Sequence, residues 1–192
     1  ATTEIYTLSL HDALPIPVYV TALGSEVAVA AGRIADGILL SAGFSIPFVA
    51  HCLKQFADGA AAAGRDPGAL KSAAFIHFSV SADGTAAREN VRRKLAFLFR
   101  NRQMAENIKA AGIPIDQDAI VDAVAARDMD RAATHVPDEA IDAFGVAGTV
   151  ADCRNSLEAY LATGLGEPVI QVSGTAEEKA LALELVREFT GG

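Results

Sequence analysis

Short apolar segments with strand character alternate with segments of helical spacing along most of this chain. The apolar segments cover residues 18–22, 38–41, 73–80 and 168–173. Helical spacing follows them, from residues 25–35 after the first segment to residues 175–189 after the last. Repeated strand–helix units imply a parallel sheet with right-handed crossover connections. The chain is therefore predicted to be an α/β protein.

The turn after the first predicted strand is Gly24-Ser25-Glu26. The backbone N–H groups of these residues are expected to point at whatever lies above the strand end. A helix N-terminus in this position binds anions, often phosphate. Many strand–helix turns carry Gly-Ser for geometry alone, so the motif by itself leaves a binding role and a structural role open.

The composition is that of a globular protein with a good core. Of the 192 residues 51% are hydrophobic, in runs too short to cross a bilayer. A net charge of −8 argues against nucleic acid as a partner. Cys52 and Cys153 have neither metal-ligand spacing nor a disulfide framework, which favours reduced cysteines in a cytoplasmic protein.

The first sixteen residues resemble an in-frame translation of a sequencing-library adapter. We therefore expect residues 1–16 to be a non-native tail and residues 17–192 to form one partial domain. The alternative is a natural lead-in segment.

The number of predicted strands constrains the architecture. A complete (β/α)₈ barrel takes roughly 250 residues. We therefore predict half of a (β/α)₈ TIM barrel, with four parallel strands and a long helical insertion, residues 85–163, before the last strand. A small doubly wound sheet with helices on both faces is the alternative.

Strand alternation predicts which polar side chains share a face. Barrel enzymes place their sites at the carboxyl-terminal mouth of the barrel. The polar residues that we expect to line this mouth are Thr21, Ser41, His77, Ser79, Gln171 and Ser173. Of these, only His77 exchanges a proton near neutral pH, so it is the one catalytic candidate. No partner carboxylate is identifiable for it, which favours a structural histidine.

Several motifs together resemble the luciferase-like flavin-dependent oxidoreductases, in particular the subgroup that includes methylenetetrahydromethanopterin reductase. They are residues 17–24 (PVYVTALG), 31–40 (AGRIADGILL), 63–67 (AGRDP), 146–149 (VAGT) with Cys153-Arg154, and 166–170 (GEPVI). The resemblance implies a barrel whose fifth to eighth strands are the four found here.

The resemblance also implies hydride transfer or oxygen activation on FMN or the deazaflavin coenzyme F420. The family's phosphate-binding turn falls on Gly24 and Ser25, and we assign Thr21 and Ala22 to the same cofactor-binding segment. Relatives often carry Pro-Lys after the glycine, whereas Ser25-Glu26 here puts a carboxylate near the anion.

A small-molecule substrate, no metal, no membrane or nucleic-acid partner, and a homo-oligomeric full-length protein are the remaining expectations. Much of the family's catalytic apparatus belongs to its first four strands, so this chain is expected to be inactive and poorly stable alone. A non-catalytic phosphate-binding α/β module or structural relative is the alternative.

Overall fold

The computed structural model describes residues 16–189. Its strands are β1 (Tyr19–Ala22), β2 (Gly37–Leu40), β3 (Lys71–Val80), β4 (Val146–Gly148) and β5 (Glu167–Val172). Its α-helices are α1 (Ser25–Ile34), α2 (Ile46–Ala62), α3 (Thr85–Phe99), α4 (Ala105–Ala111), α5 (Gln117–Ala125), α6 (Met129–Thr134), α7 (Asp138–Phe144), α8 (Val150–Leu161) and α9 (Ala176–Arg187). Residues 1–15, most of the segment interpreted as a non-native tail, lie outside this description.

All strand pairs of the described sheet are parallel. The strand β2 pairs with β1 and with residues 71–74 of β3, while β5 pairs with residues 73–78 of β3. The short β4 pairs with residues 78–80 of β3. Because residues 73–74 pair with both β2 and β5, and Phe78 with both β4 and β5, β2 and β4 share one edge of β3 and β5 takes the other.

The prediction of four strands is wrong, because the sheet in the described part of the chain has five. The additional strand, β4, interrupts the stretch 85–163 that was expected to be almost wholly helical. It is three residues long, lies between two helices, and pairs only with the last residues of β3. A segment of that length shows no readable alternation in the sequence. The order β1, β2, β3, β5 follows the chain without the reversal that defines a doubly wound sheet.

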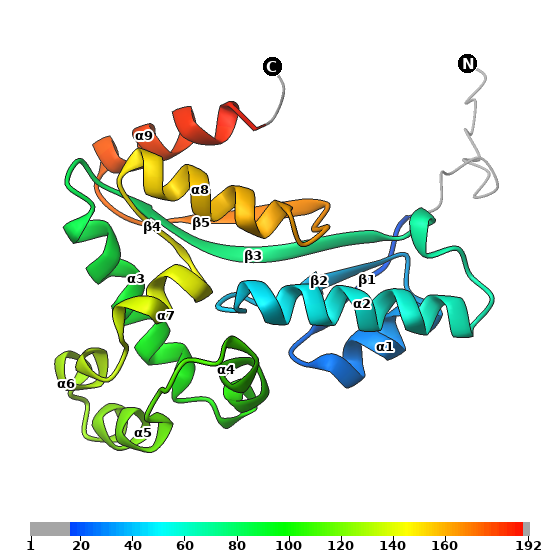
Figure 1. Ribbon diagram of the computed structural model, residues 1–192, viewed down its shortest axis with the longest axis horizontal. Coiled ribbons are helices and arrows are strands. Elements are labelled where there is room, and N and C mark those ends of the chain that lie inside the picture. The colour runs from blue at the N-terminus through cyan, green and yellow to red at the C-terminus, as the bar shows by residue number, and fades with distance from the viewer. Residues whose placement is uncertain (1–15, 190–192) are drawn as a thin grey trace, which may run out of the picture.

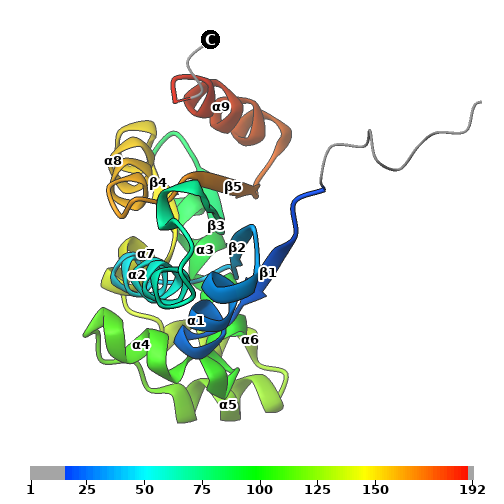
Figure 2. The ribbon, with the colours of Figure 1, turned by 90° about the vertical axis from the view of Figure 1, so that its right-hand side faces the viewer.

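The core lies between the sheet and a layer formed by α1, α2, α8 and α9 (Figures 1 and 2). Alternate residues of the strands face this layer and are buried, and they include Ala22, Ile38, Leu40, Ala74, Ile76, Phe78 and Val80. The helices α1 and α2 pack closely because each presents a glycine to the other's backbone. A Cβ on Gly32 would lie 2.0 Å from the carbonyl oxygen of Phe56, and one on Gly59 would lie 2.2 Å from that of Val29.

Side-chain hydrogen bonds cap the N-termini of α2, α8 and α9. The Phe48 N–H donates to Ser45 Oγ at the start of α2. Thr149 and Asp152 form a capping box at α8. Thr175 and Glu178 form another at α9. Each cap satisfies N–H groups that a helix leaves unpaired, which fixes where these helices begin.

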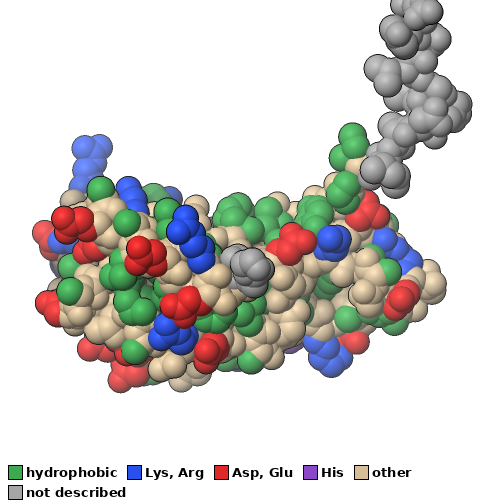
Figure 3. Space-filling model, turned by 90° about the horizontal axis from the view of Figure 1, so that it is seen from above, with side chains coloured by type: hydrophobic (Ala, Val, Ile, Leu, Met, Phe, Trp, Pro, Cys, Tyr) green, Lys and Arg blue, Asp and Glu red, His purple; other side chains and the backbone are tan. Residues whose placement is uncertain are grey.

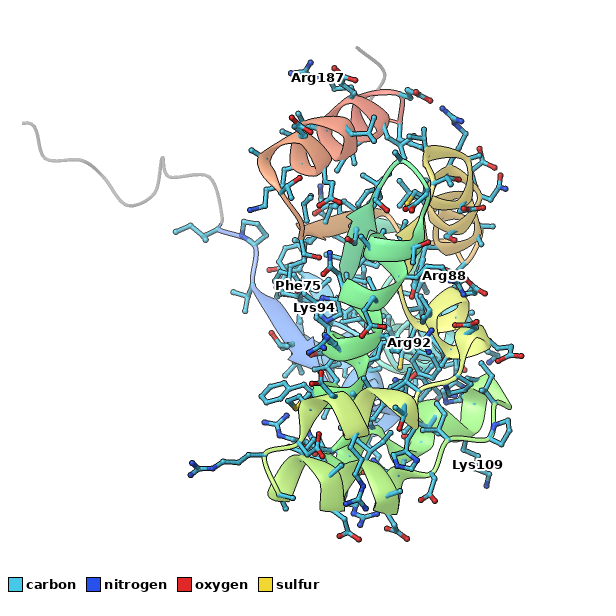
Figure 4. The ribbon with its side chains drawn as sticks, turned by 90° about the vertical axis from the view of Figure 1, so that its left-hand side faces the viewer. Phe75, Arg88, Arg92, Lys94, Lys109 and Arg187 are labelled. Carbon is cyan, nitrogen blue, oxygen red and sulfur yellow. The ribbon has the colours of Figure 1, made fainter. Side chains whose placement is uncertain are left out.

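The helices α3 to α7 form a separate group at the carboxyl end of β3 (Figure 1). Within this group Arg88 and Arg92 join α3 to α7, since Arg88 pairs with Asp142 and Arg92 pairs with Asp138. Figure 4 shows both arginines on the side of α3 that faces α7. Within residues 16–189, no helix has the length and apolar character needed to cross a lipid bilayer.

Candidate functional site

Three hollows lie in a row beside the carboxyl ends of β1, β2 and β3. Leu23 lines both the first and the second hollow, and Leu98 lines both the second and the third. The row therefore extends from the start of α1 to the face of β3 that carries His77. Barrel enzymes place their sites at this end of the strands.

The first hollow lies at the start of α1 and has a volume of about 500 Å³. Its lining residues are Leu23, Gly24, Ser25, Glu26, Val27, Gln103 and Glu106. Gly24 is the N-cap of α1, and no side chain caps the helix start. The first-turn N–H groups of a helix attract negative charge.

A carboxylate of this chain lies beside the start of α1. Ser25 Oγ donates a hydrogen bond to Glu106 Oε1 at 2.7 Å. A Cβ placed on Gly24 would lie 3.6 Å from Glu106 Oε2, so the carboxylate also faces the glycine. No Lys or Arg lines this hollow. Positive potential here comes only from the helix start, while Glu26 and Glu106 oppose it.

The buried Asn107 places Glu106 at this position. Its Oδ1 accepts from the Ser45 N–H at 2.9 Å, and its Nδ2 donates to the Gly43 carbonyl at 2.8 Å. Asn107 thereby fastens α4 to the loop between β2 and α2. Sequence reasoning missed both Glu106 and Asn107, because they lie 81 and 62 residues from their partners Ser25 and Ser45. No local motif marks them.

The second hollow, of about 330 Å³, follows the ends of β1 and β2. Its lining residues are Leu23, Ser41, Ala42, Leu98, Arg100, Asn101 and Met104. Ser41 was predicted at this mouth and lies in the wall. Tyr160 stabilises the loop that follows Ser41, because its hydroxyl donates to the Phe44 carbonyl at 2.9 Å.

The third hollow, of about 310 Å³, is almost wholly apolar and is lined by His77, Arg93, Lys94, Phe97 and Leu98. His77 comes from β3 and the other residues come from α3. His77 is 7% exposed, and neither ring nitrogen has a hydrogen-bond partner in the described structure. An unpaired buried polar group of this kind is rare in proteins.

The electrostatic environment of His77 keeps its ring neutral. Burial, and then the positive charge of Lys94, lower the pKa of His77 from 6.5 to about 4. Burial also lowers the pKa of Lys94. The His77 ring is therefore neutral near pH 7.

The other predicted residues fall into three groups. Thr21 and Gln171 are exposed, and Ala22 is fully buried in the core. Ser79 and Ser173 have structural partners: Ser79 Oγ donates to the Ser173 carbonyl, and Ser173 Oγ donates to the Phe78 carbonyl. The structure thus brings Gly24, Ser25, Ser41 and His77 to the row of hollows.

The cysteines take no part in this site. Cys52 and Cys153 are free and buried, and burial raises the pKa of each thiol to about 12. Over residues 16–189, no group of three or more His, Cys, Asp and Glu side chains is arranged to hold a metal ion.

Comparison with known proteins finds related enzymes. The chain is 30% identical over 174 residues to 5,10-methylenetetrahydromethanopterin reductase of Methanolobus tindarius, covering 88% of this chain and 52% of that protein. It is 28% identical over 171 residues to the F420-dependent glucose-6-phosphate dehydrogenase of Rhodococcus erythropolis, covering 88% and 46%. The chain thus spans about half the length of the curated relatives it matches.

The fold also matches the solved structure of a related reductase. The coenzyme F420-dependent tetrahydromethanopterin reductase of Methanopyrus kandleri superposes with a TM-score of 0.74 at 29% identity, over 89% of this chain and 49% of that one. The family model described as luciferase-like monooxygenase matches residues 3–167. The chain therefore belongs to the luciferase-like monooxygenase family.

Proposed function

We propose that this chain is part of an oxidoreductase that uses coenzyme F420 or FMN, and that its turn between β1 and α1 binds the cofactor's phosphate. The supporting observation is the Glu106 carboxylate, an anionic group held by Ser25 Oγ beside Gly24. Two relatives have F420 dependence in their names, which favours the deazaflavin over FMN.

The residues at this turn fit a phosphate group. Gly24 carries no side chain that would close the approach, and Ser25 supplies a hydroxyl donor beside a helix N-terminus. The carboxylate of Glu106 stands in for phosphate oxygens in charge and in hydrogen bonding. Glu106 is exposed, so its side chain can leave the position when a phosphate enters.

The chain's own residues would hold and orient the cofactor. Thr21 and Ala22 end the strand that leads to the turn, and Gly24 and Ser25 would bind the phosphate. The bound cofactor would supply hydride transfer. His77 stands in the row of hollows with a neutral ring, and we propose no proton transfer through it because no carboxylate partners it.

We also propose that the chain is the C-terminal half of a (β/α)₈ barrel. In support, β1 pairs only with β2 and β5 only with β3 among the described strands, which leaves two open edges. Val18, beside the β1 edge, is 60% exposed. In Figure 3 hydrophobic side chains gather along the middle of one long edge, over the strands. Open edges and exposed apolar groups predict self-association and an inactive isolated chain.

Titration of the purified chain with coenzyme F420 and with FMN, followed by cofactor fluorescence, tests the phosphate site. Ser25→Ala removes a hydroxyl donor and is expected to weaken the binding about fivefold to tenfold. Ser156→Ala, a change of the same type on α8, serves as the control. Wild-type binding that Ser25→Ala leaves unchanged would contradict the site.

A test for oxidoreductase function requires the other half of a barrel. Co-expression with the N-terminal half of the Methanolobus tindarius relative is expected to yield a one-to-one complex that binds F420. Tight phosphate binding with no such complex would favour the alternative, a non-catalytic phosphate-binding module.

A further inference from the structure

The hollow between β3 and α3 contains a cation without a partner. Lys94 takes part in no hydrogen bond or ion pair within the described part of the chain, and its side chain is partly buried. Its neighbour Arg93 is already paired with Glu89 and Asp130. Figure 4 shows Lys94 on the side of α3 away from Arg88 and Arg92, which face α7.

The same hollow contains unmet hydrogen-bonding capacity. His77 is more than nine-tenths buried and lines the hollow, yet both of its ring nitrogens lack a partner. A neutral imidazole offers one N–H donor and one acceptor. The hollow therefore lies beside an unpaired positive charge and a buried, unpaired imidazole, and a carboxylate would pair with the charge.

Apart from the paired Arg93, the rest of the wall is apolar. Phe97 and Leu98 lie three and four residues after Lys94, so all three side chains share one face of α3. Phe97 is 49% exposed, and Arg100 lies over its ring at 3.6 Å from the centroid. A volume of about 310 Å³ is at the lower end of small-molecule pockets. This wall suits the hydrocarbon body of a ligand. It offers no partner for a second charged group on that ligand.

We propose that this hollow binds an apolar organic carboxylate, with the Lys94 ammonium group at the carboxylate, His77 beside it, and the hydrocarbon body against Phe97 and Leu98. The identification of this carboxylate as part of the enzyme's substrate rests on the proposed function. The binding of a carboxylate in the hollow does not depend on that function. The hollow joins the phosphate-binding turn through Leu98 and Leu23. A cofactor and a carboxylate can therefore occupy the row together.

Calorimetric titration of the 192-residue chain with 2-naphthoate and its uncharged analogue 2-naphthamide tests the proposal. Wild type is expected to bind the naphthoate about tenfold more tightly, because a charge-assisted contact separates the two ligands. Lys94→Met keeps the apolar stem and is expected to weaken naphthoate binding about tenfold while leaving naphthamide binding unchanged. Lys109→Met is the matched control, because Lys109 is an exposed lysine on α4 without an ion-pair partner in the described residues.

Three results would overturn the proposal: equal affinity of wild type for both ligands, no effect of Lys94→Met, or an equal effect of Lys109→Met. Loss of folding is not an expected complication, since the change removes a partly buried unpaired charge, and the melting temperature checks this. The His77 ring resonances should shift with naphthoate in the wild-type chain. A separate F420 titration of the same sample reports on the proposed function, so each claim can fail without the other.

Discussion

Replacing Glu106 by glutamine is expected to strengthen phosphate binding at the start of α1. The change keeps the shape of the side chain and its ability to accept from Ser25, but removes the negative charge beside Gly24. If Glu106 stands where the cofactor's phosphate binds, every phosphate that enters must displace or tolerate this charge.

The expected size follows from the positions of the groups. Two unit charges about 5 Å apart interact by about 0.8 kcal/mol in water, the medium that applies because Glu106 is exposed. The phosphate of F420 is a diester with one negative charge, so the repulsion removed is about 0.8 kcal/mol. This corresponds to about a fourfold tighter dissociation constant.

Fluorescence titration with F420 at low ionic strength measures this effect, because salt screens exposed charges. Glu158→Gln, an exposed residue on α8, makes the same change in net charge elsewhere and is expected to leave the affinity unchanged. Equal affinity of wild type and Glu106→Gln, or equal gains in both variants, would refute the assignment of the anion position to Glu106.

Three further predictions concern the scaffold, and urea unfolding measures each. Tyr160→Phe should lower the free energy of unfolding by about 1–2 kcal/mol, because the buried Phe44 carbonyl loses its donor; an unchanged value would contradict that bond. Gly32→Ala should cost about 1–3 kcal/mol, because its Cβ would lie 2.0 Å from a carbonyl oxygen of α2; a wild-type midpoint would contradict the close contact. The pKa of His77 is lowered from 6.5 to about 4, so the unfolded chain binds more protons between these pH values and stability falls as the pH falls. His77→Gln should remove about 2 kcal/mol of that fall between pH 7 and 4.5, whereas the exposed His51→Gln should not; equal falls in both variants would contradict the buried neutral ring.

Most of the regular structure was predictable because its determinants are local. Ser45 and Thr149 are capping residues that mark the starts of α2 and α8 in the sequence, and both cap in the structure. The predicted third strand, 73–80, agrees with β3 except that β3 begins two residues earlier. Of the strands, only the three-residue β4 was missed, because its burial depends on β3 and on no pattern of its own.

The candidate site was predictable only where the backbone defines it. Gly24 and Ser25 were found from a strand–helix turn, which is a local signal. Glu106 and Lys94 reach the site from α4 and α3, and their roles depend on how those helices pack against distant strands. The sequence shows only that Glu106 is acidic and Lys94 is basic. It does not indicate that Glu106 lies beside the start of α1 or that Lys94 lacks a partner.

The central claim is that a cofactor phosphate binds where β1 meets α1. The most direct measurement is a nuclear magnetic resonance titration of the isotope-labelled chain with coenzyme F420. We expect saturable shifts of the Gly24, Ser25 and Glu26 amide resonances, accompanied by a shift of the Glu106 side-chain carboxyl as it leaves Ser25. Binding of F420 that leaves these resonances unmoved would contradict a phosphate site at this turn.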